Sequence, residues 1–316
     1  MDAKITEILV CPLCKGPLLW NEKKKEFYCR SDMKAFPVID GIPCMVPTEA
    51  REMKEEEIEE LDKKMSFTVI IPARLASTRL PNKPIADICG KPMIVRVAEQ
   101  ALKSGASRVI CAVDDELILK ACEANGIEAC LTRKDHACGT DRLCEAAEVC
   151  KIPDDEIIVN VQGDEPLIPP KVIKNVAELL MNRSDCSMGT AAIRIHSAEE
   201  FFNPNVVKVV ADKNGSALYF SRAPIPWDRD GFAKDRNALP RDLGLRHVGI
   251  YSYRCAFLKA YPQLPKSDLE SWESLEQLRA LYNGYKIAVD IFEEEIPPGV
   301  DTLADLEAVR AYLQKK

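Results

Sequence analysis

The sequence predicts an α/β protein, with a mostly parallel twisted sheet and flanking helices, preceded by a small N-terminal β domain. From Phe67 onward, short runs rich in β-branched residues alternate with amphipathic, helix-like segments, as in strands joined by crossover helices. Residues 1–48 are instead punctuated by Cys and Pro and contain only short strand-like runs. These two patterns predict two domains of different architecture.

A charged segment separates the two patterns. Residues 49–65 are dense in Glu, Lys and Arg and have few apolar anchors, which is typical of a solvated helical linker. We therefore predict a small domain at 1–48, a linker at 49–65 and a large domain at 66–316. The segment that begins at Met65 is like the start of an independent protein, so we interpret the chain as a fusion of two units.

The large domain supplies the expected elements in a regular order. Short β-branched runs predict strands at Thr68–Ile71, Arg108–Val113, Glu128–Thr132 and Ile157–Gln162. Helical patterns lie between them at Met93–Ser104 and Glu116–Asn125. Such sheets bind ligands at the carboxyl ends of their strands. The segment Val206–Tyr253 breaks the alternation and suggests an antiparallel insertion or a dimerisation arm.

The composition is that of an ordinary globular protein. The 316 residues carry a formal net charge of -7, which argues against broad nucleic-acid binding. No apolar run is long enough to span a bilayer, and the N-terminus lacks the apolar core of a signal peptide. The 13 cysteines are odd in number and mostly sit in apolar segments, which indicates reduced thiols. We expect a cytoplasmic protein with neither a membrane nor a nucleic-acid partner.

The first predicted strand of the large domain leads into a basic loop. Arg74, Arg79 and Lys83 follow it within a few residues, Ser77 adds a hydroxyl, and small residues such as Ala73 allow close approach to the backbone. Cations and exposed amides at the end of a parallel strand suit a polyphosphate. The alternative is a solvated basic loop. We favour the phosphate site because of its position at the strand end.

Carboxylates follow two other predicted strands. Asp164 comes after the run that ends in Gln162 and Gly163, and Asp301 follows the strand-like run Ile287–Phe292. Brought together, two such carboxylates would hold Mg²⁺, which prefers oxygen ligands and substrate phosphates. Taken singly, each Asp could equally be a turn-capping residue.

The N-terminal domain carries a partial metal-binding pattern. Cys11 and Cys14 form a C-x-x-C pair, and Cys29 and Asp32 repeat the spacing with an acidic residue in the last position. Cys44 is an alternative fourth ligand. Two interpretations stay open, namely a zinc site on these residues and a metal-free β module that packs on its own apolar side chains.

Long motifs through the large domain resemble those of the 3-deoxy-manno-octulosonate (KDO) cytidylyltransferases, also called CMP-KDO synthetases. They run in order at Ile70–Pro84, Gly90–Met93, Thr132–Arg142, Val159–Pro166, Phe202–Val210, Leu218–Arg229, Leu245–Tyr251, Leu275–Arg279 and Gly299–Thr302. The segment Phe36–Val46 is similar to the end of Trm112-like domains, which are of zinc-ribbon type. The resemblance implies a Rossmann-like nucleotidyltransferase of GT-A type that makes CMP-KDO for lipopolysaccharide from CTP and KDO, with Mg²⁺.

The resemblance also implies roles for single residues. It makes Arg74, Lys83 and Asp164 catalytic and pairs Asp164 with Asp301 as magnesium ligands. The nucleotide would contact Ala73, Arg74, Ser77, Lys83, Arg142 and Gln162. The sugar acid would contact Arg222, His247, Tyr251, Glu276 and Gln277. For His247, a buried core histidine is the competing interpretation.

Assembly and substrate choice are less constrained by the sequence. Family members are usually homodimers, and Trm112-like modules bind partner enzymes, so we expect a homodimer and a protein partner for the N-terminal domain. Two alternatives to KDO transfer remain, namely transfer to another acid sugar, such as 8-amino-KDO or a sialic-acid-like substrate, and a non-catalytic binding protein on the same scaffold.

Overall fold

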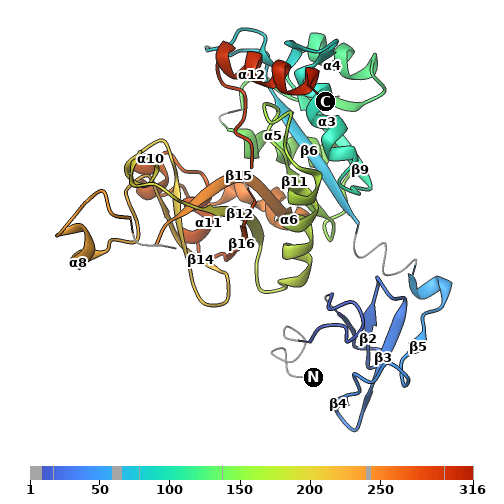
Figure 1. Cartoon of the computed structure of the whole chain (residues 1–316). Helices are drawn as coiled ribbons and strands as arrows, with labels where there is room; N and C mark the ends of the chain where they lie inside the picture. The colour runs from blue at the N-terminus through green and yellow to red at the C-terminus, as the bar shows by residue number, and fades with distance from the viewer. Residues whose placement is uncertain are drawn as a thin grey trace. The chain divides into compact units, whose positions relative to one another are not determined.

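The computed structural model describes residues 9–16, 18–58, 66–77, 79–136, 138–239, 243–294 and 296–315. The chain divides into two compact units, Met1–Ser66 and Phe67–Lys316. Figure 1 shows a small strand-built unit at the blue end of the chain and a large unit in which a sheet is flanked by helices.

The small unit is an antiparallel sheet with its own apolar core. Its strands are β1 (Leu19–Asn21), β2 (Glu26–Cys29), β3 (Lys34–Ile39), β4 (Ile42–Pro43) and β5 (Arg51–Glu52). They are ordered β1-β2-β3-β4. Strand β5 also pairs with β3, on the edge away from β2. The aromatic rings of Phe27 and Phe36 are fully buried in the core beside Cys11 and Cys29. A core this small supplies little hydrophobic stabilisation.

The predicted solvated linker is wrong for residues 51–58. Strand β5 pairs with β3, and the carboxylate of Glu57 is buried in the small unit. Glu57 accepts hydrogen bonds from both Nη atoms of Arg51 at 2.7 Å and from the Tyr28 hydroxyl at 3.1 Å. These bonds to cations hold the pKa of Glu57 well below its usual range. A charge-dense segment is therefore part of the small unit; residues 59–65 of the predicted linker lie outside the described residues.

The large unit is built on a nine-stranded sheet. Its strands are β6 (Phe67–Ala73), β9 (Arg108–Val113), β10 (Glu128–Leu131), β11 (Ile157–Asn160), β12 (Met188–Arg194), β13 (Lys208–Ala211), β14 (Ala217–Ser221), β15 (Leu245–Arg254) and β16 (Ile287–Phe292). The main path runs β10-β9-β6-β11-β15-β12-β16, and β13 and β14 branch from β15. The two-residue strands β7 (Asp87–Ile88) and β8 (Lys91–Pro92) form a separate small pair. The four strands predicted from the sequence are confirmed as β6, β9, β10 and β11.

Helices cover both faces of the sheet (Figure 1). The longer ones are α3 (Met93–Leu102), α4 (Glu116–Glu123), α5 (Gly139–Val149), α6 (Pro170–Asn182) and α12 (Leu303–Gln314). The shorter ones are α7 (Ala198–Phe202), α8 (Arg229–Phe232), α9 (Cys255–Ala260), α10 (Asp268–Glu273), α11 (Gln277–Tyr282), and the 3₁₀ turns η1 (Lys83–Ile85) and η2 (Tyr261–Gln263). One core joins α3, α4 and α6 to the sheet, and the other joins α5, α9 and α11. Burial on both faces explains the near-continuous apolar composition of β6 and β11.

The expectation of an insertion at Val206–Tyr253 is only partly right. Strands β13 and β14 do form an antiparallel hairpin, but β15 lies at the centre of the main sheet, between β11 and β12. It is antiparallel to both neighbours. Polar residues such as Arg246 and His247 interrupt its apolar pattern, so the sequence indicated a strand here but not its central position in the sheet. Among the described residues, no helix is long and apolar enough to cross a membrane.

Candidate active site

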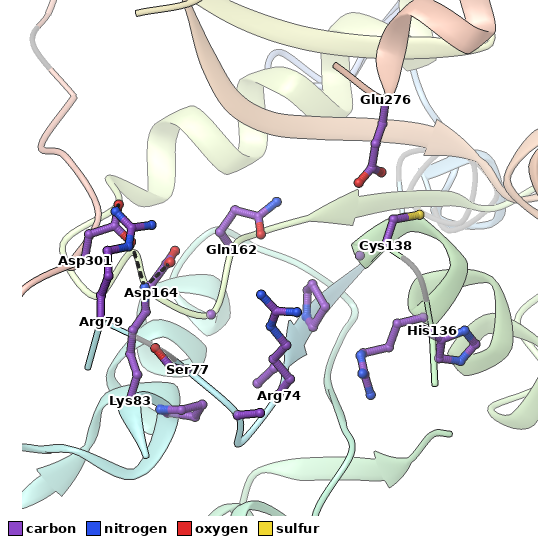
Figure 2. A pocket seen from close by; sticks show the side chains of 17 residues that line it. Arg74, Ser77, Arg79, Lys83, His136, Cys138, Gln162, Asp164, Glu276 and Asp301 are labelled. Carbon is purple, nitrogen blue, oxygen red and sulfur yellow. Dashed lines mark hydrogen bonds and ion pairs between the residues drawn. The ribbon is translucent and has the colours of Figure 1, made fainter. Parts of the chain in front are cut away.

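A cavity of about 420 Å³ opens at the carboxyl ends of β6 and β11. Its lining residues come from five separate segments, and Figure 2 shows their side chains around it. Its wall is made of Pro72, Ala73, Arg74, Ala76, Ser77, Arg79, Lys83, Pro84, His136, Cys138, Gly139, Arg142, Gln162, Gly163, Asp164, Glu276 and Asp301. The cavity thus lies at the sheet edge where the sequence predicts a ligand.

The two predicted metal ligands converge on one point, and a lysine occupies that point. Lys83 Nζ lies 2.6 Å from an oxygen of Asp164 and 3.1 Å from an oxygen of Asp301 (Figure 2). Arg79 Nη1 lies 3.1 Å from the other oxygen of Asp301. Both carboxylates therefore reach a single cation, and their oxygen donors suit Mg²⁺.

Close backbone packing brings the two carboxylates together. Gly163 is needed before Asp164, because a Cβ there would lie 2.8 Å from the carbonyl oxygen of Pro72, near the end of β6. From the other side, Val300 N donates to the carbonyl oxygen of Asp164 at 2.8 Å. Asp301 is the next residue, so this hydrogen bond fixes its distance from Asp164.

The opposite wall comes from α5 and the start of α11. Arg142 of α5 is 5% exposed and Gln162 follows β11, and both line the cavity. The carboxylate of Glu276 accepts a hydrogen bond from the Thr140 hydroxyl at 2.7 Å and faces the cavity (Figure 2). Glu276, predicted as a sugar contact, is thus placed across the cavity from Arg74 and Lys83.

The other predicted sugar contacts do not line this cavity. His247 and Tyr251 lie along β15, and Arg222 follows the end of β14. Gln277 is buried in α11, and its amide nitrogen has no hydrogen-bond partner in the described part of the chain. The His247 ring is 5.2 Å from that of Tyr251 and 5.2 Å from that of Phe220.

His247 is held in this row by a hydrogen bond as well as by its aromatic neighbours. Its Nε2 lies 3.0 Å from the Thr190 hydroxyl. That hydroxyl donates to the carbonyl of Ile250, so Nε2 is the donor. Burial lowers the pKa of His247 to about 3.

Arg222 is anchored by backbone oxygens. Its Nε donates to the carbonyl of Glu273 at 2.7 Å, and its Nη1 to the carbonyl of Pro204 at 3.1 Å. Glu273 in turn accepts from the Arg222 backbone N–H at 2.9 Å and from the Ser221 hydroxyl at 2.6 Å. The structure therefore places Arg222 firmly, at a distance from the cavity wall.

Several wall residues were not predicted from the sequence. His136, Cys138 and Gly139 line the cavity from the segment before and at the start of α5. They fall within the motif Thr132–Arg142. That motif contributed to the family resemblance, but it did not indicate that these three residues line a cavity. Burial raises the pKa of Cys138 to about 12, which favours the protonated thiol at neutral pH.

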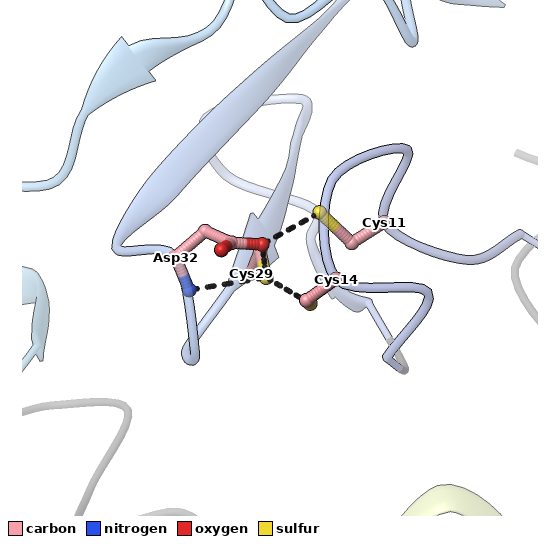
Figure 3. A group of neighbouring side chains, drawn as sticks. All are labelled: Cys11, Cys14, Cys29 and Asp32. Carbon is pink, nitrogen blue, oxygen red and sulfur yellow. Dashed lines mark hydrogen bonds between the residues drawn. The ribbon is translucent and has the colours of Figure 1, made fainter.

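The small unit contains a second group of ligand-type side chains. One ligand atom from each of Cys11, Cys14, Cys29 and Asp32 lies within 4.8 Å of all the others (Figure 3). The Cys14 and Cys29 sulfurs are 3.5 Å apart, close to the ~3.7 Å that a tetrahedral zinc site with 2.3 Å bonds requires. Cys44, the alternative ligand, is not in the group. All 13 cysteines lie in the described part of the chain, and all are free.

Comparison with known proteins identifies both units. The family model "Cytidylyltransferase" matches residues 68–289, and "Trm112p-like protein" matches residues 2–41. The 3-deoxy-manno-octulosonate cytidylyltransferase of Acidovorax sp. (strain JS42) is 57% identical over 254 residues, which cover 78% of this chain and 97% of the relative. That of Herminiimonas arsenicoxydans is 59% identical over 249 residues, covering 78% and 99%.

A solved structure agrees with these sequence matches. CMP:2-keto-3-deoxy-manno-octonic acid synthetase complexed with CTP superposes with a TM-score of 0.72 at 42% identity, covering 79% of this chain and 99% of the other. The segment that matches the family model, residues 68–289, includes every residue of the cavity wall except Asp301. The chain therefore belongs to the family of 3-deoxy-manno-octulosonate cytidylyltransferases.

Proposed function

We propose that the large unit transfers CMP from CTP to 3-deoxy-D-manno-octulosonate and releases pyrophosphate. The observation that carries this proposal is the convergence of Lys83, Asp164 and Asp301 on one point of a cavity that Arg74 also lines. Cations for a triphosphate and carboxylates for Mg²⁺ are thus combined at the edge of a parallel sheet. The relatives carry the matching name, and a relative of known structure is complexed with CTP.

In this reaction a sugar hydroxyl forms a bond to the α-phosphorus of CTP while the bond to the pyrophosphate oxygen breaks. Asp164 and Asp301 would hold Mg²⁺, which when bound neutralises phosphate charge and orients the nucleophile. Arg74 and Lys83 stabilise the charge that grows on the departing pyrophosphate. Ala73 and Ser77 let the phosphates approach the loop backbone, and Arg142 and Gln162 bind the rest of the nucleotide.

The sugar acid lies on the side of the cavity away from the basic loop. Glu276 projects there, and the row of Arg222, His247 and Tyr251, with Gln277 nearby, supplies further polar groups on the same face of the sheet as Glu276. The buried amide nitrogen of Gln277 is a donor with no hydrogen-bond partner among the residues that the structure describes. A buried polar atom of this kind is costly unless a ligand or water satisfies it.

An assay of pyrophosphate release with CTP and Mg²⁺ tests the function. We expect release with KDO and none without an acceptor; 8-amino-KDO and sialic acid, run in parallel, test the alternative of another acid sugar. Asp164→Asn should lower turnover by about 100-fold or more, because it removes the negative charge of one proposed metal ligand. Exposed Asp155→Asn is the matched control. Wild-type turnover in Asp164→Asn would refute the metal assignment, and no release with any acceptor would favour the non-catalytic alternative.

For the small unit, we propose that Cys11, Cys14, Cys29 and Asp32 bind zinc. Three sulfurs and one carboxylate oxygen, all within 4.8 Å of one another, suit this ion. Burial raises the pKa of the Cys11 and Cys29 thiols, so without a cation both remain protonated. The ion would also compensate for the small apolar core.

Assembly is the last part of the proposal. We propose a cytoplasmic homodimer that uses the segment from Val206 to Tyr253, and an accessory role for the small unit in binding a protein partner. The exposed apolar side chains of the unit, including Ile39 and Ile42, support the partner role. Deletion of residues 1–65 that left solubility, oligomeric state and turnover unchanged would contradict that role.

A further inference from the structure

Asp114 is a buried carboxylate directly behind the cavity wall. It follows β9, is 8% exposed, and does not line the cavity. Neither the family motifs quoted above nor the predicted roles include it. A buried carboxylate is costly unless it is paired, so its partners indicate its purpose.

The first partner belongs to the basic loop. Asp114 Oδ1 accepts a hydrogen bond from the backbone N–H of Leu75 at 2.9 Å. Leu75 directly follows Arg74, which lines the cavity. The bond therefore fixes the backbone from which the Arg74 side chain projects.

The second partner is Arg142 on the opposite wall. Asp114 Oδ2 lies 3.5 Å from Arg142 Nη2. The other Nη of Arg142 donates to the Thr132 hydroxyl at 2.5 Å, and Thr132 donates to the carbonyl of Val113 at 3.0 Å. Arg142 is thus held by Asp114, which follows β9, and by Thr132, which follows β10.

The charges explain why such an anchor is needed. Burial and the positive charge of Arg74 both lower the pKa of Arg142, while Asp114 and Glu145 raise it. Two guanidinium groups that face one cavity repel each other until an anionic ligand arrives. Asp114 contacts both the loop that carries Arg74 and the side chain of Arg142. It therefore holds the two cations in place before an anionic ligand binds.

We infer that Asp114 is a positioning residue that preorganises Arg74 and Arg142 for the triphosphate nucleotide. The inference rests on the proposed use of CTP. Preorganised cations bind a phosphate more tightly, because less ordering is left to occur on binding. The loss should therefore fall on nucleotide affinity, although Asp114 does not touch the nucleotide.

Direct calorimetric titration of the full chain with CTP tests the inference. Asp114→Asn keeps an oxygen for Leu75 N–H and removes the charge, and we expect CTP affinity to fall about 10-fold. Asp114→Ala removes both contacts and should weaken binding further. The matched control is Asp115→Asn; Asp115 is the N-cap of α4, pairs with Lys134 and should retain wild-type affinity.

A double-mutant cycle separates positioning from a general effect on folding. Asp114→Asn should cost less CTP affinity in an Arg142→Met background, because the pair is already broken. A purely structural role would instead lower the melting temperature equally in both backgrounds. Thr132→Val, which removes the other partner of Arg142, gives a second test if Asp114→Asn folds poorly.

The results that would overturn the positioning role differ from the result that would overturn the proposed function. If the wild type does not bind CTP, the proposed function fails. If the wild type binds CTP and both Asp114→Asn and Thr132→Val bind it equally well, the positioning role is overturned. Weaker binding by Asp114→Asn, with additive effects in the cycle, would also overturn it.

Discussion

At the residue scale, Lys83 is the cation that stabilises the two carboxylates of the candidate site. Its ammonium group lies between the carboxylates of Asp164 and Asp301 and compensates their repulsion. A metal ion that bound these oxygens would displace the ammonium toward the phosphates. By our proposal, the same three residues would also bind Mg²⁺ and phosphate together.

His247 gives a residue-scale prediction on pH. Its pKa is lowered to about 3 in the folded protein, against an ordinary value near 6.5. The unfolded chain therefore binds a proton between these values and the folded protein does not, so stability is lost as the pH falls below about 6.5. The contribution of His247 is at most ~1.4 kcal/mol per pH unit.

Urea unfolding at pH 7.5, 6 and 5 measures this effect. His247→Gln keeps a donor for the Thr190 hydroxyl and should show a weaker loss of stability on acidification than the wild type. Exposed His196→Gln serves as the control and should follow the wild type. Parallel curves for wild type and His247→Gln would contradict the assignment of a neutral, enclosed His247.

At the scale of elements, the N-terminus of α12 is coupled to the candidate metal site. Thr302 and Asp305 form a reciprocal capping box. Asp305 Oδ2 also accepts from the backbone N–H of Asp301 at 3.0 Å. The helix cap thus determines where the carboxylate of Asp301 lies, and the apolar side of α12 packs with Leu80 of the basic loop.

Removing the cap should therefore change both stability and metal dependence. We expect Asp305→Ala to lower the stability of the chain and to raise the Mg²⁺ concentration needed for half-maximal turnover. Glu307→Ala on the exposed side of the same helix is the control, since its only described ion pair is with Arg310. An unchanged Mg²⁺ dependence in a destabilised Asp305→Ala would show that the cap stabilises the helix alone.

At the scale of the whole molecule, the chain joins a large unit with two extensive apolar cores to a small unit with a minor core. The large unit is stabilised by burial on both faces of its sheet. The small unit depends on the Glu57 ion-pair cluster and, by our proposal, on zinc.

Metal analysis of the purified chain tests that dependence. We expect about one zinc per chain, lost in Cys29→Ser and kept in the control Cys44→Ser. Chelation should lower the melting temperature of the small unit, because metal-binding free energy is folding free energy in such modules. A zinc-free protein prepared with zinc in the medium, equally stable with and without chelator, would support the metal-free alternative.

The local patterns of the sequence were sufficient for much of this protein. Alternating strand and helix patterns predict β6, β9, β10 and β11, because both faces of these strands are buried and their composition is correspondingly apolar. Ordered motifs indicated the family, and strand-end residues such as Lys83 and Asp164 were predicted because parallel strands present their carboxyl ends at one edge.

Only the tertiary structure decided the rest. β15 joins the centre of the sheet although its sequence is half polar, and residues 51–58 fold onto the small unit although they are densely charged. In both cases partners distant in sequence satisfy the polar groups, and no local pattern records such partners. The role of Asp114 in the site was likewise not predictable from local sequence. Its contacts with Leu75 and Arg142 form only after β9, the basic loop and α5 have come together.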